Sequence, residues 1–209
     1  MSANSQLVFV SFFTPDGKYP LLAKKLINSL NRFHLPHDIV EMPSMKSWVD
    51  GCSFKSTFIL DKLLTHRRPV IWLDIDTEVW KYPSLLFGDE DFGIYNWHAD
   101  NNHHLDGTFE VDPQAKTLCC SGGVQKWGYT APAIELLLRW NNAIKENGGD
   151  AGDDVMLDRA FNESQPPVNP IWLPKIYNRM DKHTWHWREI PEHDVVINHD
   201  FTEGRHREG

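Results

Sequence analysis

The sequence predicts an α/β fold with a mixed, mostly parallel sheet flanked by helices. Short continuous apolar runs, typical of strands buried on both faces, alternate with amphipathic segments of helical period over residues 7–76. One run, at residues 70–76, ends in two carboxylates, at the edge where open α/β sheets bind ligands. This alternation of strand and helix implies parallel pairing with right-handed crossovers.

The elements of the N-terminal half follow from their apolar periodicity. Leu22, Leu26 and Leu30 share one face of a helix that has Pro20 in its first turn. Pro69 suits the first residue of a buried strand, where its missing N–H costs least. The predicted elements are strand 7–13, helix 20–32, strand 37–42, helix 54–66 and strand 70–76.

The C-terminal half has a less regular pattern. Thr130 is a candidate N-cap for a long helix. Asn147-Gly148-Gly149 would end that helix. Segments 98–117 and 163–194 are expected to be mostly irregular. The other predicted elements are strand 92–97, an apolar stretch at 118–124 that small residues interrupt, helices 131–146 and 153–162, and strand 195–197.

Composition predicts one soluble globular domain over residues 1–209, since 41% of the residues are hydrophobic and 24% charged. No apolar run approaches the roughly 18 residues of a membrane span. Three cysteines, two of them adjacent, make a poor disulfide framework and favour a reducing, cytoplasmic setting. The net charge of −8 argues against a broad nucleic-acid surface, although Arg205 and Arg207 form a local basic patch. Composition does not indicate an oligomeric state.

Asp74 and Asp76 are the strongest functional signal from the residues alone. Because side chains alternate along a strand, the two carboxylates are expected on one side, where they repel each other. A hard divalent ion held by oxygen ligands relieves that repulsion. The alternative is that these acids are ordinary turn residues or helix caps.

Residues 69–83 resemble the DxD region of GT-A-fold glycosyltransferases, in particular of nucleotide-diphospho-sugar transferases. Other segments resemble that family in the same order along nearly the whole chain: Lys55, residues 121–124, residues 152–155, Leu173-Pro174 with Tyr177-Asn178, and residues 197–199. Ser121 stands where the family often has Asn, and Arg205 and Arg207 stand where it usually has Lys.

The resemblance implies a GT-A-like, Rossmann-like fold. It implies the transfer of a hexose or pentose from a nucleotide-diphosphate sugar, most naturally a UDP-sugar, to an acceptor hydroxyl. Retention and inversion of the anomeric configuration both stay open, and the resemblance favours retention. It implies a Mn²⁺ or Mg²⁺ cofactor held by Asp74, Asp76 and His199, with Asp74 alternatively on the donor ribose. Arg205 or Arg207 would face the diphosphate. From the residues alone, His199 could be an ordinary strand-end histidine, and the two arginines a solvated tail.

The donor site is expected beside the loop that follows the first strand, because that loop faces the nucleotide in doubly wound sheets. Thr14 and Tyr19 lie in this loop. Backbone groups near Phe12 and Phe13 would hydrogen-bond a pyrimidine, and Tyr19 would stack on it or merely pack at a helix start. Lys55 would reach the sugar or the diphosphate, or lie solvated in a first helical turn. Gly122 and Gly123 would admit the sugar closely, or form a plain turn.

Asp153 and Asp154 are the predicted catalytic residues. A carboxylate there would act as a general base or steady an oxocarbenium-like state. Acids in the first turn of a helix are also stabilising without any catalytic role.

The acceptor is open: a saccharide, a lipid-linked sugar, a protein, or a hydroxylated base in viral DNA, the last of which would place the protein in a host cytoplasm. Trp97 and the loop at 98–104 are candidates to shape its pocket, with a histidine-rich metal site as the rival interpretation of that loop. Two other functions stay open. They are an inactive nucleotide-sugar binding module and a metal-dependent phosphohydrolase or nucleotidyltransferase, although the sequence has no Gly-rich phosphate loop.

Overall fold

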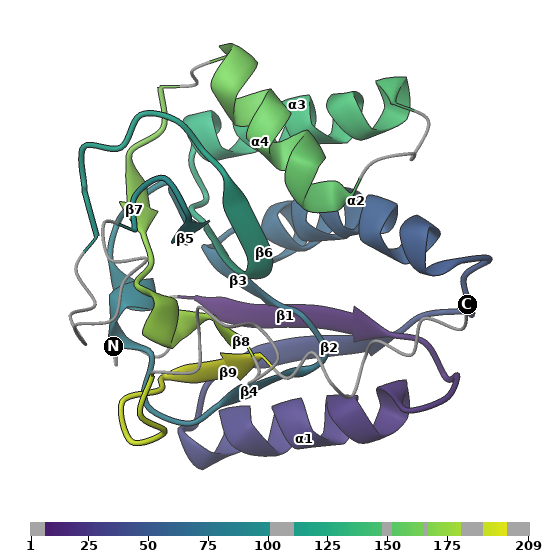
Figure 1. Cartoon of the computed structure of the whole chain (residues 1–209). Helices are drawn as coiled ribbons and strands as arrows, with labels where there is room; N and C mark the ends of the chain where they lie inside the picture. The colour runs from purple at the N-terminus through teal and green to yellow at the C-terminus, as the bar shows by residue number, and fades with distance from the viewer. Residues whose placement is uncertain (1–6, 101–110, 148–151, 165–166, 181–189, 200–209) are drawn as a thin grey trace.

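A six-stranded mixed sheet lies between two layers, with one helix and a small second sheet on one face and three helices on the other (Figure 1). The computed structural model describes residues 7–100, 111–147, 152–164, 167–180 and 190–199. The large sheet has the order β2-β1-β3-β6-β5-β7. Its strands are β1 (Val8–Phe13), β2 (His37–Glu41), β3 (Val70–Leu73), β5 (Phe92–Asn96), β6 (Cys120–Trp127) and β7 (Pro170–Trp172).

Strand pairing confirms a mixed, mostly parallel sheet. β1 pairs in parallel with β2 and β3, and β5 pairs in parallel with β7. β6 runs antiparallel to both of its neighbours, β3 and β5. Because β6 is antiparallel, β3 pairs with the second half of β6, with Val124 opposite Leu73, and the first half of β6 extends past the end of β3. The start of β6 and the acidic motif therefore meet at one edge of the sheet.

The helices cover the two faces unequally. α1 (Tyr19–Arg32) lies on one face, and α2 (Trp48–His66), α3 (Ala131–Glu146) and α4 (Asp153–Ser164) lie on the other (Figure 1). Along β3, Val70 and Trp72 pack toward α2, α3 and α4, while Ile71 and Leu73 pack toward α1. Burial on both faces explains why β3 is an unbroken apolar run.

The small sheet lies on the same face as α1. It consists of β4 (Thr77–Val79), β9 (Ile197–His199) and β8 (Arg179–Met180), in the order β4-β9-β8. β4 is tied to α1, since the Val79 amide donates to Ser29 Oγ at 3.0 Å and the Arg32 guanidinium donates to the Val79 carbonyl. β4 and β9 run antiparallel, with Thr77 opposite His199. This register carries a residue from the end of the chain to the acidic motif.

Capping residues account for the helix boundaries. The Ser47 side chain accepts from the Asp50 amide at 3.1 Å at the start of α2, and Arg67 ends that helix in the left-handed conformation with φ 50°. Thr130 accepts from the Ala133 amide at 3.4 Å, which confirms the predicted cap of α3. Two 3₁₀ helices complete the described part of the chain, η2 (Ser84–Phe87) and η3 (Lys175–Tyr177).

Several predicted boundaries are wrong. α2 begins at Trp48 rather than at residue 54, because the Ser47 cap starts a helix that tolerates Gly51 in its interior. The strand predicted at 70–76 stops at Leu73, and β4 was not predicted. Segment 163–194 is largely irregular where the structure describes it, but three short elements that were not predicted lie there: β7, η3 and β8. The last strand is displaced from 195–197 to Ile197–His199.

No helix in the described part of the chain is both long and apolar enough to cross a membrane.

Candidate active site

A tight turn after β3 carries the two acids of the motif. The Asp74 amide donates to the Gly123 carbonyl at 2.8 Å, and the Thr77 amide donates back to the Asp74 carbonyl at 3.0 Å. The carboxylates thus reach the same side through a turn between β3 and β4, not through strand alternation as predicted. This turn lies at the carboxyl end of β3, where open α/β sheets bind ligands, so both carboxylates face the ligand-binding side of the sheet.

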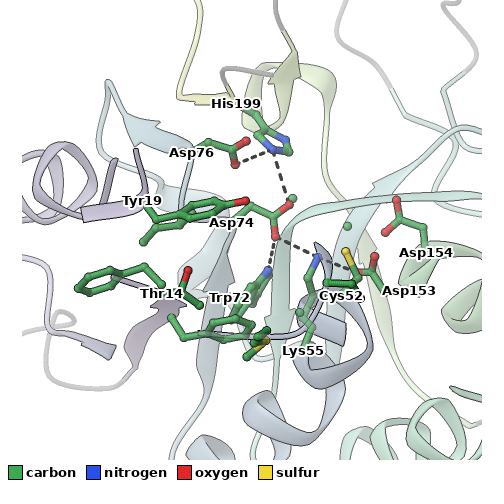
Figure 2. Close-up of a pocket in the computed structure, with 18 of the residues that line it drawn as sticks. Thr14, Tyr19, Cys52, Lys55, Trp72, Asp74, Asp76, Asp153, Asp154 and His199 are labelled. Carbon is green, nitrogen blue, oxygen red and sulfur yellow. Dashed lines mark hydrogen bonds and ion pairs between the residues drawn. The ribbon is translucent and has the colours of Figure 1, made fainter. Parts of the chain in front are cut away.

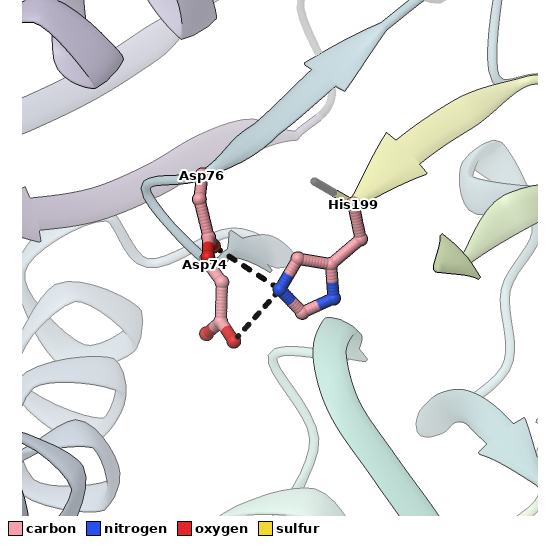
Figure 3. Close-up of side chains that lie close together, drawn as sticks. All are labelled: Asp74, Asp76 and His199. Atoms are coloured by element: carbon pink, nitrogen blue, oxygen red, sulfur yellow. Dashed lines mark hydrogen bonds and ion pairs between the residues drawn. The ribbon is translucent and has the colours of Figure 1, made fainter. Parts of the chain in front are cut away.

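His199 meets both carboxylates through one ring nitrogen (Figure 3). Its Nε2 lies 3.1 Å from Oδ1 of Asp76 and 3.6 Å from Oδ2 of Asp74. The three residues each offer a ligand atom, and these atoms all lie within 4.8 Å of one another. The structure therefore brings together the three residues predicted as metal ligands.

Asn178 contacts the His199 ring on the side away from the two carboxylates and fixes its orientation. The Oδ1 atom of the buried Asn178 lies 3.3 Å from Nδ1 of His199. An amide oxygen only accepts, so this contact assigns the proton to Nδ1. Nε2, on the opposite side of the ring, is then directed at the two carboxylates, as in histidines that bind metals.

The charged groups of this cluster shift one another's pKa values. Burial opposes the charged imidazolium, but Asp76 outweighs burial and raises the pKa of His199 above its ordinary value. Burial likewise opposes ionisation of Asp76, but the pairing with His199 holds the pKa of Asp76 below its ordinary value. Asp76 is therefore ionised at neutral pH, in the state that a cation requires.

Lys55 lies between the acidic motif and α4. Its Nζ is 3.0 Å from Oδ1 of Asp74 and 2.6 Å from Oδ2 of Asp153, and the side chain is buried (Figure 2). Desolvation opposes the charge, but Asp153 and Asp74 outweigh it and raise the pKa of Lys55 well above its ordinary value. Lys55 lies in the interior of α2 rather than in a first turn, and its ammonium contacts two protein carboxylates.

The two acids at the start of α4 have different surroundings. Both line the cavity, but Asp153 is paired with Lys55, whereas Asp154 lies beside Gly122 of β6. Burial, followed by repulsion from Asp153, raises the pKa of Asp154 to about 7. The Asp154 carboxyl can therefore be protonated or ionised near neutral pH.

Gly122 and Gly123 are required by neighbouring side chains. A Cβ on Gly122 would lie 2.2 Å from Oδ1 of Asp154, and a Cβ on Gly123 would lie 2.3 Å from Nδ1 of His199. Both glycines lie within β6, so the alternative of a plain turn is wrong. The space that they leave is taken by the side chains of Asp154 and His199.

These residues line one cavity of about 370 Å³ at the edge of the large sheet. Phe13, Thr14 and Tyr19, the predicted nucleotide contacts, lie along its wall, and Figure 2 shows Tyr19 beside the two motif acids. Burial, followed by the charge of Asp76, raises the pKa of Tyr19. The remaining lining residues are Phe12, Asp16, Met45, Ser47, Gly51, Cys52, Lys55, Trp72, Asp74, Ile75, Asp76, Ser121, Gly122, Gly123, Asp153, Asp154 and His199.

No individual role was predicted from the sequence for Trp72, Cys52 or Asn178, which lie in this region. Trp72 precedes Asp74 by two positions, and its indole Nε1 donates to Asp74 Oδ1 at 2.7 Å. Cys52 lines the cavity one turn before Lys55, on a part of α2 whose helical pattern was not recognised. Asn178 was identified only as part of a motif. The i, i+2 spacing of Trp72 and Asp74 was the one available sequence signal.

Other predicted residues lie elsewhere. Arg205 and Arg207 fall outside the described residues, as does most of the loop at 98–104. Trp97 packs edge-on against Tyr95, with ring centroids 4.9 Å apart, and is not among the residues that line the cavity. His98 is exposed and contacts Thr117 Oγ1 through its Nδ1 at 2.9 Å. The predicted role of this region in acceptor binding stays a prediction.

The cluster of Asp74, Asp76 and His199 fits a small divalent cation. Two carboxylates and one imidazole form a hard-to-borderline donor set that suits Mn²⁺ or Mg²⁺. The His199 tautomer set by Asn178 leaves Nε2 as the ligand atom. The pKa of His199 is raised by the negative charges of Asp76 and Asp74, which a bound cation would neutralise.

Comparison with solved structures identifies the fold. The chain superposes with a TM-score of 0.60 on a glycosyltransferase involved in the glycosylation of the major capsid of PBCV-1, at 13% identity over 92% of this chain and 91% of that chain. The TM-score is 0.54 for mouse xyloside xylosyltransferase 1 in its apo form, at 15% identity over 93% and 96% of the two chains. No protein-family model and no curated protein sequence matches. At these identities the likeness shows the fold, which is the GT-A-like glycosyltransferase fold.

Proposed function

We propose that this protein is a metal-dependent glycosyltransferase that moves a sugar from a nucleotide-diphosphate sugar to an acceptor hydroxyl. One observation carries the proposal: Asp74, Asp76 and His199, which are far apart in the sequence of a GT-A-like fold, converge at a cavity on the ligand-binding edge of the sheet. The neighbouring Lys55–Asp153 pair and Asp154 provide the further charged groups that such a reaction uses.

A bound Mn²⁺ or Mg²⁺ would neutralise the negative charge that develops on the departing nucleoside diphosphate. Asp76, His199 and one oxygen of Asp74 would hold the ion, and Asn178 would keep the His199 ring in position. Phe13, Thr14 and Tyr19 would bind the base, for which we favour uracil, at the end of β1. These assignments are supported by the shared cavity that all of the metal and base contacts line.

The charge of the cavity supports a metal requirement. Five of its lining residues are carboxylic acids (Asp16, Asp74, Asp76, Asp153 and Asp154), whereas the described cationic candidates are Lys55 and His199. A diphosphate would be repelled by such a wall unless a divalent ion and further cations compensated for it. Arg205 and Arg207 are proposed as those cations.

Asp154 is proposed to act at the reacting carbon, as a base or as a stabiliser of positive charge on the sugar, in a retaining reaction. Asp153 would assist indirectly, by holding Lys55. The two glycines of β6 would keep Asp154 and His199 in place rather than only admit the sugar. The separate environments of Asp153 and Asp154 support this division of roles.

The sugar and the acceptor are proposed only as classes. Since one structural neighbour is named as a xylosyltransferase and the other as a glycosyltransferase for a capsid protein, both pentose and hexose donors are candidates, with saccharides and proteins as acceptors. A modified nucleic acid is a further candidate. The free thiols of Cys52, Cys119 and Cys120 support a cytoplasmic setting, in a host cell if the protein is viral.

A donor panel tests the proposal. The protein is incubated with Mn²⁺ and each of several UDP-, GDP- and ADP-sugars, and free nucleoside diphosphate is measured together with donor binding. We expect one donor class to yield nucleoside diphosphate and sugar in equal amounts. Binding without product would indicate a nucleotide-sugar binding module. Release of nucleoside monophosphate and sugar phosphate would indicate a phosphohydrolase.

A further inference from the structure

Trp72 connects the hydrophobic core to the acidic motif. Its ring packs against Phe12 and Phe58, with centroids 5.4 and 5.8 Å apart, and the residue is 3% exposed. Its polar edge points the other way, toward the turn that follows β3, and donates to Asp74 at 2.7 Å. A buried indole N–H needs an acceptor, so the position of the ring and that of the carboxylate are linked.

The two oxygens of Asp74 have different surroundings. Oδ1 accepts from the Trp72 indole at 2.7 Å and lies 3.0 Å from Nζ of Lys55. Oδ2 is the oxygen that faces His199, at 3.6 Å from Nε2. Two donors on Oδ1 oppose rotation of the carboxylate, because any turn of the group that moves Oδ1 weakens both contacts.

The two donors also support each other. Nζ of Lys55 lies 5.5 Å from the centroid of the Trp72 ring, within the range of a cation–π contact. Asp153 holds the same ammonium at 2.6 Å from the opposite side. Both donors to Oδ1 are therefore fixed by groups outside the acidic motif.

We propose that Trp72 is a positioning residue that, together with Lys55, restricts Asp74 to metal binding through Oδ2 alone and so favours Mn²⁺ or Mg²⁺ over Ca²⁺. This inference rests on the metal site proposed above. Mg²⁺ and similar small ions require near-octahedral geometry with short bonds, which single carboxylate oxygens satisfy. Ca²⁺ accepts more ligands and binds carboxylates through both oxygens. Asp74 with one oxygen withheld is a poorer ligand for Ca²⁺.

The test is the ion selectivity of Trp72→Phe, which keeps an aromatic ring and removes the indole donor. Mn²⁺ affinity is measured from the electron paramagnetic resonance signal of free Mn²⁺, and Ca²⁺ affinity by competition. Trp172→Phe is the matched control. Trp172 is also 3% exposed, and its indole donates at 3.2 Å to the Ala115 carbonyl, away from the cavity.

We expect Trp72→Phe to lose roughly tenfold in Mn²⁺ affinity, the usual size of such supporting contacts, while Ca²⁺ affinity is kept, so that selectivity shifts about tenfold toward Ca²⁺. The double variant Lys55→Met/Asp153→Asn removes the other donor without changing the net charge and should shift selectivity in the same direction. It decides the question if Trp72→Phe does not fold.

Unchanged selectivity, or an equal loss of affinity for both ions, would overturn the role of Trp72, because a purely structural defect affects both ions alike. Wild-type protein that binds no Mn²⁺ would overturn the metal site itself and this inference with it. The two failures are therefore distinguishable, since the second appears before any substitution is made.

Discussion

Asp76 and His199 lie 123 positions apart in the sequence, and their side chains meet at 3.1 Å between Oδ1 and Nε2. The pairing of β4 with β9 causes this contact, because it sets Thr77, the residue after Asp76, opposite His199. The small sheet is thus as important to the site as the acidic motif. Substitutions that disturb the contacts holding the His199 ring in position should affect metal binding without altering any carboxylate.

Asn178→Leu tests the contact between Asn178 and the His199 ring. The substitution keeps the branched shape and the number of non-hydrogen atoms of a fully buried side chain but removes the acceptor that contacts Nδ1 of His199. We expect Mn²⁺ affinity to fall about tenfold, since contacts that orient a histidine ligand have effects of this size. Titration with Mn²⁺ measures it. Asn162→Leu is the control, because Asn162 bonds the Leu118 backbone outside the cavity. Equal affinities in the two variants would contradict the assigned role of Asn178.

Gly123→Ala should also weaken metal binding. The added Cβ would lie 2.3 Å from Nδ1 of His199 and 2.9 Å from Oδ1 of Asn178, so the imidazole must shift. We expect lower Mn²⁺ affinity and a loss of roughly 1–3 kcal/mol in the free energy of unfolding, as for other overpacked cores. Denaturant unfolding and Mn²⁺ titration measure the two effects. Gly152→Ala is the control, because a Cβ there meets no atom within 4 Å.

Gly122→Ala should separate turnover from metal binding. Its Cβ would lie 2.2 Å from Oδ1 of Asp154, so this variant displaces the proposed catalytic carboxyl rather than a metal ligand. We expect Mn²⁺ affinity within about twofold of wild type and a loss of roughly a hundredfold in kcat, the range for a displaced acid–base group. A variant that keeps wild-type kcat would contradict the role of Asp154, and one that loses Mn²⁺ would contradict the separation of the two sites.

Asp154→Asn should make the metal-free protein more stable than wild type, and this difference should grow as the pH rises. Burial and Asp153 raise the pKa of Asp154 to about 7 in the folded state, so ionisation is easier in the unfolded chain. The wild type therefore loses stability between the ordinary pKa of an aspartate and about pH 7, and the asparagine variant does not. We expect a gain on the order of 1–2 kcal/mol at pH 8, reduced from the full shift because the carboxyl faces the cavity.

Calorimetric scans in EDTA at pH 5 and pH 8 measure this gain. The Tm advantage of Asp154→Asn should be larger at pH 8 than at pH 5, by a few degrees for a chain of this size. An advantage that does not grow with pH would show that Asp154 is ionised in the folded protein across the whole range.

The N-terminal part of the central sheet was predictable because β1 and β3 are buried on both faces. β1 and β3 are continuous apolar runs, and the helices between the N-terminal strands have clear periodicity. β4, β7 and β8 have two or three residues each, too few for any period to be read, and they form only because longer elements hold them. The start of α2 was missed because Gly51 and Asp50 lower its apparent helix propensity.

The candidate site was predictable as a set of residues but not as a set of contacts. The order of motifs placed Asp74, Asp76 and His199 together, and the structure confirms that they converge. That the two glycines make room for Asp154 and His199 could not be predicted, since a sequence does not show which side chain fills the space above a glycine. The pairing of Lys55 with Asp74 and Asp153 depends on the packing of α2 against α4, which periodicity does not fix.

The rate of nucleoside diphosphate release from the preferred nucleotide sugar, compared between wild type and Asp76→Asn, tests the central claim most directly. Asparagine keeps the size of the side chain and removes the charge that binds the ion. Asp38→Asn is the control, because Asp38 is also paired, with Lys62 at 2.7 Å and His66 at 2.9 Å, but lies outside the cavity. We predict Mn²⁺-dependent release by wild type and Asp38→Asn, and a loss of roughly a hundredfold or more in Asp76→Asn. Equal rates in wild type and Asp76→Asn would contradict a metal-dependent glycosyltransferase at this site.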